Sequence, residues 1–203
     1  MRRKCFMPER HKTHCPEERI NAKGYGPTSF WLHEPEALIK QLDLYQGMVL
    51  LDAGCGAGEY SLLAAQQVGD KGQVIALDTT PLSIEKLAKT SKREGLTNIQ
   101  GHVCDITGHL PVASRSVDLI LLSTVLHIRA VRNRASDIFH EFRRVLRPKG
   151  KVAIIECKKE KADFGPPLHS RLAPEEIESM AASSGLQKTS LILFDYTYLL
   201  NLA

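Results

Sequence analysis

The sequence predicts an α/β protein in which strands and helices alternate, as a doubly wound sheet requires. Apolar segments with strand character recur along the chain near residues 49–52, 73–77, 99–103, 117–122, 150–156, 187–193 and 196–201. A glycine-rich loop directly after the first segment leads into a helix. With 203 residues, 43% of them hydrophobic, the chain can bury one full core but is too short for a second large domain.

The first expected strand, residues 48–51, is wholly apolar and should be buried on both faces. Gly54, Gly56 and Gly58 follow at alternate positions, and a backbone without side chains can be approached closely by a ligand. A helix is expected from Tyr60 to Val68. A simple tight turn is the alternative to a ligand loop. The spacing G-x-G-x-G differs from the dinucleotide fingerprint G-x-G-x-x-G, which disfavours a nicotinamide-dependent oxidoreductase.

Acidic residues end the first three expected strands. Asp52 lies two residues before the first glycine, Asp78 ends the second strand, and Asp105 follows the third. Asp78 is placed to accept hydrogen bonds from two ribose hydroxyls, and Asp105 from an exocyclic amine of adenine. Such acids suit a ligand with hydroxyls, amines and a positive charge, such as S-adenosylmethionine. The candidate cofactor-binding residues are Asp52, Gly54, Cys55, Gly56, Asp78, Thr79, Asp105, Ile106 and Ser123.

Four motifs occur in a familiar order: VLLDAGCGAG (49–58), IALD (75–78), SVDLI (116–120) and RVLRPKGK (144–151). Over roughly residues 35–203 the chain resembles class I S-adenosylmethionine-dependent methyltransferases. It is most similar to small ubiquinone/menaquinone-type (type 11) enzymes, some of which have an FGPP segment like that at 164–167. The resemblance implies a seven-stranded, mostly parallel, Rossmann-like sheet with helices on both faces. Its strand order would be 3-2-1-4-5-7-6, with the last strand antiparallel.

The resemblance also implies transfer of the methyl group of S-adenosylmethionine to a small-molecule acceptor by direct in-line displacement. A non-catalytic cofactor-binding module or partner subunit is an alternative, and an RNA or metalloid/thiol methyltransferase is another. After the fourth strand the chain lacks the Asn/Asp-Pro-Pro-aromatic motif of enzymes that methylate exocyclic amines of bases, so DNA is not an expected partner. The cysteine that arsenite methyltransferases usually have there is also absent.

Two later helices are predicted by apolar periodicity. Ile138, Phe142, Val145 and Leu146 form one apolar face that should end at residues 147–150. A weaker face over residues 177–184 should end at Gly185.

Candidate acceptor-binding residues follow the fourth and fifth strands, because ligands of open α/β sheets lie outside the carboxyl ends of strands. His127 is the candidate general base, since histidine exchanges protons near neutrality, although a packing role is the alternative. Cys157 and Arg171 are expected to bind the substrate, Arg171 as the cation for an anionic one. Lys158, Lys159 and Lys161 could also hold an anionic substrate, but solvation is the favoured interpretation for Lys159 and Lys161.

Residues 1–23 contain seven basic and three acidic residues, an excess of +4 that equals the net charge of the whole chain. We expect a mobile basic arm at 1–23 and the methyltransferase domain at 24–203. Cys5, His11, His14 and Cys15 lack the spacing of a familiar zinc site, so no metal is expected. Tyr25 is a candidate substrate-binding residue in an aromatic segment, 24–33, that could close over the cofactor or simply pack on the sheet.

The expected location is cytoplasmic. No apolar run reaches the ~18 residues of a membrane span, and the N-terminus has no signal-peptide pattern. The five cysteines do not form a secreted disulfide pattern, so free thiols are expected. The oligomeric state is left open.

Overall fold

The computed structural model describes residue 30, residues 35–162 and residues 165–203. The strands in this part are β1 (Val49–Ala53), β2 (Gln73–Asp78), β3 (Ile99–Val103), β4 (Val117–Ser123), β5 (Leu146–Cys157), β6 (Lys188–Leu193) and β7 (Thr197–Leu202). The helices are α1 (Pro35–Gln41), α2 (Glu59–Val68), α3 (Pro81–Arg93), α4 (Arg129–Arg132), α5 (Ala135–Val145) and α6 (Pro174–Ala181), with short 3₁₀ helices η3 (Leu168–Ser170) and η4 (Ala182–Ser184).

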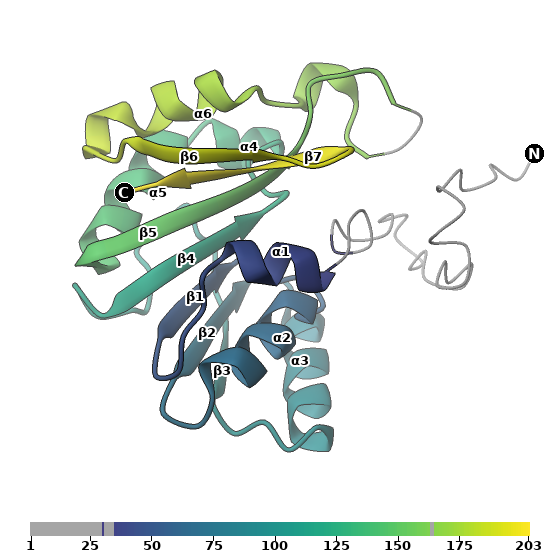
Figure 1. Cartoon of the computed structure of the whole chain (residues 1–203), viewed down its shortest axis with the longest axis vertical. Coiled ribbons are helices and arrows are strands. Elements are labelled where there is room, and N and C mark those ends of the chain that lie inside the picture. Colours follow the sequence, from purple (N-terminus) through teal and green to yellow (C-terminus); the bar gives the residue numbers. More distant parts are fainter. Residues whose placement is uncertain (1–29, 31–34, 163–164) are drawn as a thin grey trace, which may run out of the picture.

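The strands form one sheet in the order β3-β2-β1-β4-β5-β7-β6 (Figure 1). Strands β1 to β5 pair in parallel, whereas β7 is antiparallel to both β5 and β6. The predicted fold class, strand order and antiparallel last strand are therefore confirmed.

The start of β5 differs from the prediction. Leu146 was expected on the apolar face of the preceding helix, but α5 ends at Val145 and Leu146 pairs with Val117 as the first residue of β5. Pro148 explains the early ending, because proline cannot continue a helix and pushes the residue before it toward extended backbone. The second predicted helix, α6, ends at Ala181, and the 3₁₀ helix η4 continues it to Ser184, where Gly185 stops it with a left-handed φ of 79°.

Helices cover both faces of the sheet, which is why its central strands are apolar at nearly every position. Leu50 and Leu119 face α1 and α2, while the adjacent Leu51 and Ile120 face α5. Helices α1 to α3 lie on the first face and α4 to α6 on the other (Figure 1). The described part contains no helix that is long and apolar enough to cross a membrane.

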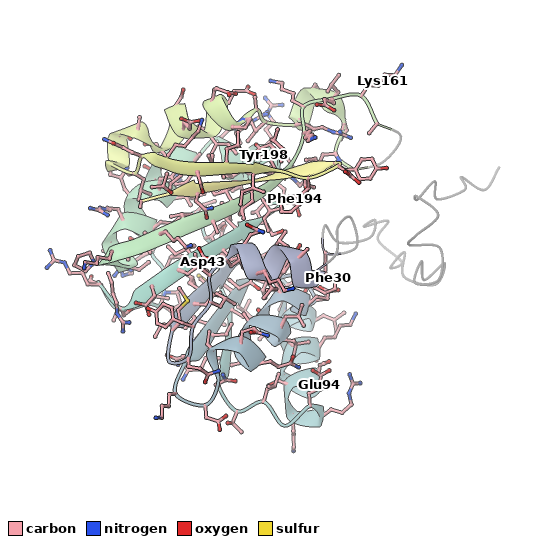
Figure 2. The ribbon with its side chains drawn as sticks, in the orientation of Figure 1. Phe30, Asp43, Glu94, Lys161, Phe194 and Tyr198 are labelled. Atoms are coloured by element: carbon pink, nitrogen blue, oxygen red, sulfur yellow. The ribbon has the colours of Figure 1, made fainter. Side chains whose placement is uncertain are left out.

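Because β1 to β5 are parallel, their carboxyl ends meet at one edge of the sheet. The turn between β6 and β7 reaches the same edge, since Thr197 pairs with Cys157 and the Lys158 amide donates to the Tyr196 carbonyl at 3.0 Å. Phe194 in this turn lies on the side toward α1 (Figure 2). The edge thus gathers the loops after five strands, where the sequence places its candidate residues.

Candidate functional site

The loop after β1 leaves part of its backbone uncovered. A side chain at Gly54 would meet Val125 at 2.7 Å, so this glycine allows the loop after β4 to pack closely. Gly56 has nothing within 4 Å of the place a side chain would occupy, and its φ of 54° is in the left-handed region that glycine adopts without strain. The loop is therefore packed at Gly54 and open at Gly56, as a ligand cradle requires.

Asp78 holds this loop in place from the end of β2. Its Oδ2 accepts a hydrogen bond from the Gly56 amide at 2.9 Å, and its Oδ1 accepts from the Thr80 amide at 2.8 Å. The amides of Gly54 and Cys55 donate to the Leu77 carbonyl, both at 2.8 Å. One carboxylate thus connects the glycine loop to the end of the neighbouring strand.

Asp52 is buried beneath the loop, with 1% of its surface exposed. Burial raises the pKa of this carboxyl to about 7; the hydrogen bond from Ser61 Oγ, 2.6 Å from Oδ2, opposes the rise, and the charges of Glu59 and Asp78 add to it. A cation bound nearby would favour the charged carboxylate. This environment suits a positively charged ligand and would repel a pyrophosphate.

The loop after β3 supplies a third acid. Asp105 is exposed and its Oδ1 accepts from the Thr107 amide at 2.9 Å, whereas Ile106 is buried. The Cys104 amide donates to the Asp78 carbonyl at 2.9 Å, which joins the ends of β2 and β3. The structure thus brings Asp52, Asp78 and Asp105 to the ends of three adjacent strands, as the sequence predicted. Thr79 is exposed next to Asp78.

The chain turns sharply after Ser123, the last residue of β4. Thr124 has a φ of 51°, a conformation uncommon for a β-branched residue and one that costs on the order of 1–3 kcal/mol. Its amide donates to the Ile155 carbonyl at 2.7 Å, which ties the turn to β5. The turn then places Val125 against Gly54 and leads to His127.

A buried glutamate that the sequence analysis did not single out lies behind His127. Glu156 on β5 is 1% exposed, and its Oε1 accepts from the amides of Leu126 at 2.8 Å and His127 at 3.3 Å. Its Oε2 lies 3.3 Å from Nδ1 of His127, whose side chain is 23% exposed. The sequence did contain a signal, since Glu156 is another acid at the end of an apolar strand.

Cys157 and Arg171 lie in the interior. Burial raises the pKa of the Cys157 thiol to about 11; the charge of Glu156 adds to the rise, and that of Arg171 opposes it. Arg171 is 4% exposed and donates to backbone carbonyls of the loop after β5: Nε to Pro166 at 2.8 Å, and Nη1 to Glu160 at 2.8 Å and Lys158 at 3.2 Å. That these residues contact a substrate stays a prediction.

The remaining candidates are peripheral or outside the described residues. Lys161 points away from the loop after β5 (Figure 2), and Lys159 pairs with Glu176 at 2.7 Å. Tyr25 and the arm at 1–23 are not among the described residues. Phe30, from the same aromatic segment as Tyr25, packs edge-to-face on Tyr60 of α2 with ring centroids 5.1 Å apart. Of the two alternatives for this segment, Phe30 therefore shows packing.

A seven-stranded sheet of this order, with an open glycine loop and acids at three adjacent strand ends, defines the Rossmann-like fold of the class I methyltransferases. The residues fit S-adenosylmethionine, because uncovered backbone and carboxylates match its cation, amines and hydroxyls. A family model described as a methyltransferase domain matches residues 44–192. The chain belongs to this family of S-adenosylmethionine-dependent methyltransferases.

Solved structures and curated proteins agree with this membership. A methyltransferase from Aquifex aeolicus superposes with a TM-score of 0.77 at 26% identity, covering 87% of this chain and 93% of that one. An arsenite methyltransferase of Halobacterium salinarum is 40% identical over 53% of this chain and 27% of its own length. A demethylmenaquinone methyltransferase of Lactobacillus johnsonii is 34% identical over 58% and 47%. The chain thus spans half or less of these two curated relatives.

Proposed function

We propose that the protein transfers the methyl group of S-adenosylmethionine to a small-molecule acceptor by direct in-line displacement. The observation that carries the proposal is the open backbone at Gly56, held by Asp78 and flanked by the buried Asp52. A tight turn with no ligand would need neither the uncovered loop nor three acids around it. The intact acids Asp52, Asp78 and Asp105 also argue against the alternative of a non-catalytic module or partner subunit.

In this proposal each strand end holds a different part of the cofactor. The backbone of Gly54, Cys55 and Gly56 faces its amino-acid end, with Asp52 as the nearby negative charge. Asp78 and Thr79 bind the ribose hydroxyls, while Asp105 and Ile106 bind the adenine, one by a hydrogen bond and the other by apolar contact. Ser123 at the end of β4 completes the set on the side of the acceptor.

The bound cofactor supplies a methyl group already activated by a sulfonium. What the chain adds is mostly position: holding two reactants in near-attack geometry contributes on the order of 7–11 kcal/mol in favourable models. His127, partly exposed in the loop after β4, would take a proton from the acceptor. Arg171 would shape the acceptor side by holding the loop after β5.

Arsenite is a second candidate acceptor, because the similarity to the Halobacterium arsenite methyltransferase is 40% identity over half of this chain. Metalloid binding would need several accessible thiolates. Among the described residues Cys55 and Cys157 are buried and Cys104 is partly buried, and burial raises the pKa of all three thiols. Raised pKa values keep these three thiols neutral near pH 7, which favours an organic acceptor.

Calorimetric titration of the full chain tests the cofactor assignment. S-adenosylmethionine and S-adenosylhomocysteine should bind and raise the melting temperature, whereas NAD and NADP should do neither. A ligand that binds only the native state stabilises it by about 2.7 kcal/mol at one hundred times its Kd. Binding of NAD without binding of S-adenosylhomocysteine would overturn the proposal.

A further inference from the structure

The contacts of Glu156 determine which nitrogen of His127 holds the proton. A carboxylate only accepts hydrogen bonds, and two backbone amides already donate to Oε1. Nδ1 of His127, 3.3 Å from Oε2, must therefore be the donor in that contact. In the neutral ring Nε2 is then left with a free lone pair.

We propose that Glu156 is a positioning residue that keeps His127 in the tautomer whose Nε2 accepts a proton. The acceptor is then a group that loses a proton on methylation, such as a hydroxyl or a thiol. This inference rests on the proposed methyl transfer and names the substrate class of the same site. It also assigns distinct parts to the pair: His127 is accessible enough to meet a substrate, and Glu156, at 1% exposure, is not.

The groups around Glu156 do not compete for this role. Tyr198 lies opposite Glu156 on β7, and its hydroxyl donates to the Leu172 carbonyl at 2.8 Å. Burial raises the pKa of both Tyr198 and Cys157, and the charge of Glu156 adds to both shifts, so the two side chains stay neutral near pH 7. Arg171 is engaged with loop carbonyls.

The pair is also coupled to the glycine loop. Glu156 holds the amides of Leu126 and His127, and the same turn packs Val125 against Gly54. His127 is thereby carried to the edge of the sheet next to the end of β1, where the cofactor site lies. The backbone amides occupy only Oε1, and His127 Nδ1 is the partner of Oε2, which a buried carboxylate oxygen needs because burying an unpaired polar atom is costly.

The proposed step balances in atoms and charge. The acceptor atom X of an X–H group forms a bond to the methyl carbon, and the methyl–sulfur bond breaks with its electron pair remaining on sulfur. Nε2 of His127 takes the proton of X–H, and the charged ring is stabilised by Glu156 until that proton passes to water. The positive charge of the sulfonium thus leaves as one proton.

The tautomer can be measured without knowing the acceptor. Imidazole ¹⁵N signals of the full chain, with His127→Asn to assign them, should show His127 protonated at Nδ1 and free at Nε2 in its neutral form. Glu156→Gln has the same shape, but its amide can donate to Nδ1 and should move the ring proton to Nε2. A tautomer exchange of this kind in a Ser-His-Asp triad lowers kcat about 10⁴-fold.

Glu141→Gln is the matched control. Glu141 on α5 also accepts from a backbone amide, that of Leu110 at 2.7 Å, and from Arg144, but it has no contact with His127. Loss of the Glu141 carboxylate in Glu141→Gln should lower the melting temperature and leave the ¹⁵N signals of His127 unchanged. A wild-type ring protonated at Nε2, or the same tautomer in Glu156→Gln, would overturn the positioning role. Glu156→Asp, which retains the charge, should restore the wild-type tautomer at least in part.

A panel of acceptors tests the substrate class. With labelled S-adenosylmethionine, phenols and alkyl thiols should include substrates, and His127→Asn and Glu156→Gln should each lower their turnover about 10²–10⁴-fold at unchanged S-adenosylhomocysteine affinity. Methylation confined to tertiary amines or dialkyl sulfides, which have no proton to lose, would refute the inference while leaving methyl transfer established. Failure of the wild-type chain to bind S-adenosylhomocysteine would instead refute the proposed function.

Discussion

Asp78 has two roles, because its carboxylate accepts hydrogen bonds from the Gly56 and Thr80 amides and is also expected to bind the ribose. Asp78→Ala should weaken S-adenosylhomocysteine binding by roughly 2–4 kcal/mol, since two hydroxyls lose a charged acceptor worth ~1.5–3 kcal/mol per bond and water replaces part of it. Isothermal titration calorimetry measures the change.

The control for Asp78 is Asp137→Ala, an exposed acid on α5 that pairs with Arg134. Surface substitutions of this kind are usually within about 0.5 kcal/mol. The Asp78 variant should also melt slightly earlier without ligand, because the glycine loop loses its hold on β2. Equal affinity of a folded Asp78→Ala and the wild type would place the ribose elsewhere.

Asp52 makes stability depend on pH. Its pKa is raised from 3.8 to about 7 by burial, so between these values the folded state binds more protons than the unfolded state. Stability without ligand should therefore fall as pH rises from 4 to 7, by an amount on the order of a few kcal/mol. Asp52→Asn can still accept a hydrogen bond from Ser61, and it should remove the part of this decrease in stability that comes from titration of Asp52.

Urea unfolding of both proteins at pH 5 and pH 8 measures this difference. Ser61→Ala is informative beside it, because it removes the bond that opposes the raised pKa and should steepen the pH dependence. Parallel pH profiles for the wild type and Asp52→Asn would show that Asp52 does not titrate in this range.

The loop after β5 depends on Arg171. Arg171→Ala should destabilise the fold by about 1–3 kcal/mol, because carbonyls of Lys158, Glu160 and Pro166 lose a buried charged donor. Cofactor affinity should stay the same and turnover of the acceptor should fall, since the loop borders the acceptor side. Thermal unfolding, calorimetry and a methylation assay separate the three effects.

Lys159→Ala provides the comparison for Arg171, because Lys159 lies in the same loop but forms a half-exposed pair with Glu176. Such pairs contribute about 0–1 kcal/mol. If Arg171→Ala and Lys159→Ala change stability and turnover by the same amount, the guanidinium of Arg171 does not organise the loop.

The strands were more predictable from sequence than the contacts at their ends. Leu50 and Leu51 lie on an apolar segment, and burial on both faces follows from that pattern alone. Asp78 was found because its place after a strand and a glycine loop is itself a sequence pattern. Glu156 was missed because its partners, Leu126 and His127, are about thirty residues away and meet it only when β4 and β5 pair.

The contacts of Arg171 could not be predicted from the sequence either. Its expected contact with an anionic substrate stays a prediction, and the sequence did not reveal that its guanidinium donates to carbonyls of a loop that folds back over it. The paths of irregular loops are set by tertiary contacts, so sequence periodicity does not reveal them. Leu146 was misplaced because Pro148 limits how far the helix can extend without fixing its last residue, and the pairing of Leu146 with Val117 then makes Leu146 part of the strand.

The net charge is distributed unevenly between the N-terminal segment and the rest of the chain. Residues 1–23 carry an excess of +4 and the remaining 180 residues balance, so the acids of the proposed cofactor site belong to a neutral body. The described core is closed on both faces by α1 to α6, with Phe30 as its first described residue (Figure 2). Binding of the cofactor should therefore depend on the body and not on the arm.

Deleting residues 1–23 tests this division. The segment has a charge excess and little apolar content, so we expect the fold and the S-adenosylhomocysteine affinity to change by less than about 1 kcal/mol. Melting curves and calorimetry of the full and shortened chains measure both quantities. Unfolding of the shortened chain, or zinc in the full chain that is lost with Cys5 and Cys15, would make the segment structural. Salt-sensitive RNA binding that disappears on deletion would favour an RNA acceptor, because phosphate contacts by a basic arm weaken as salt rises.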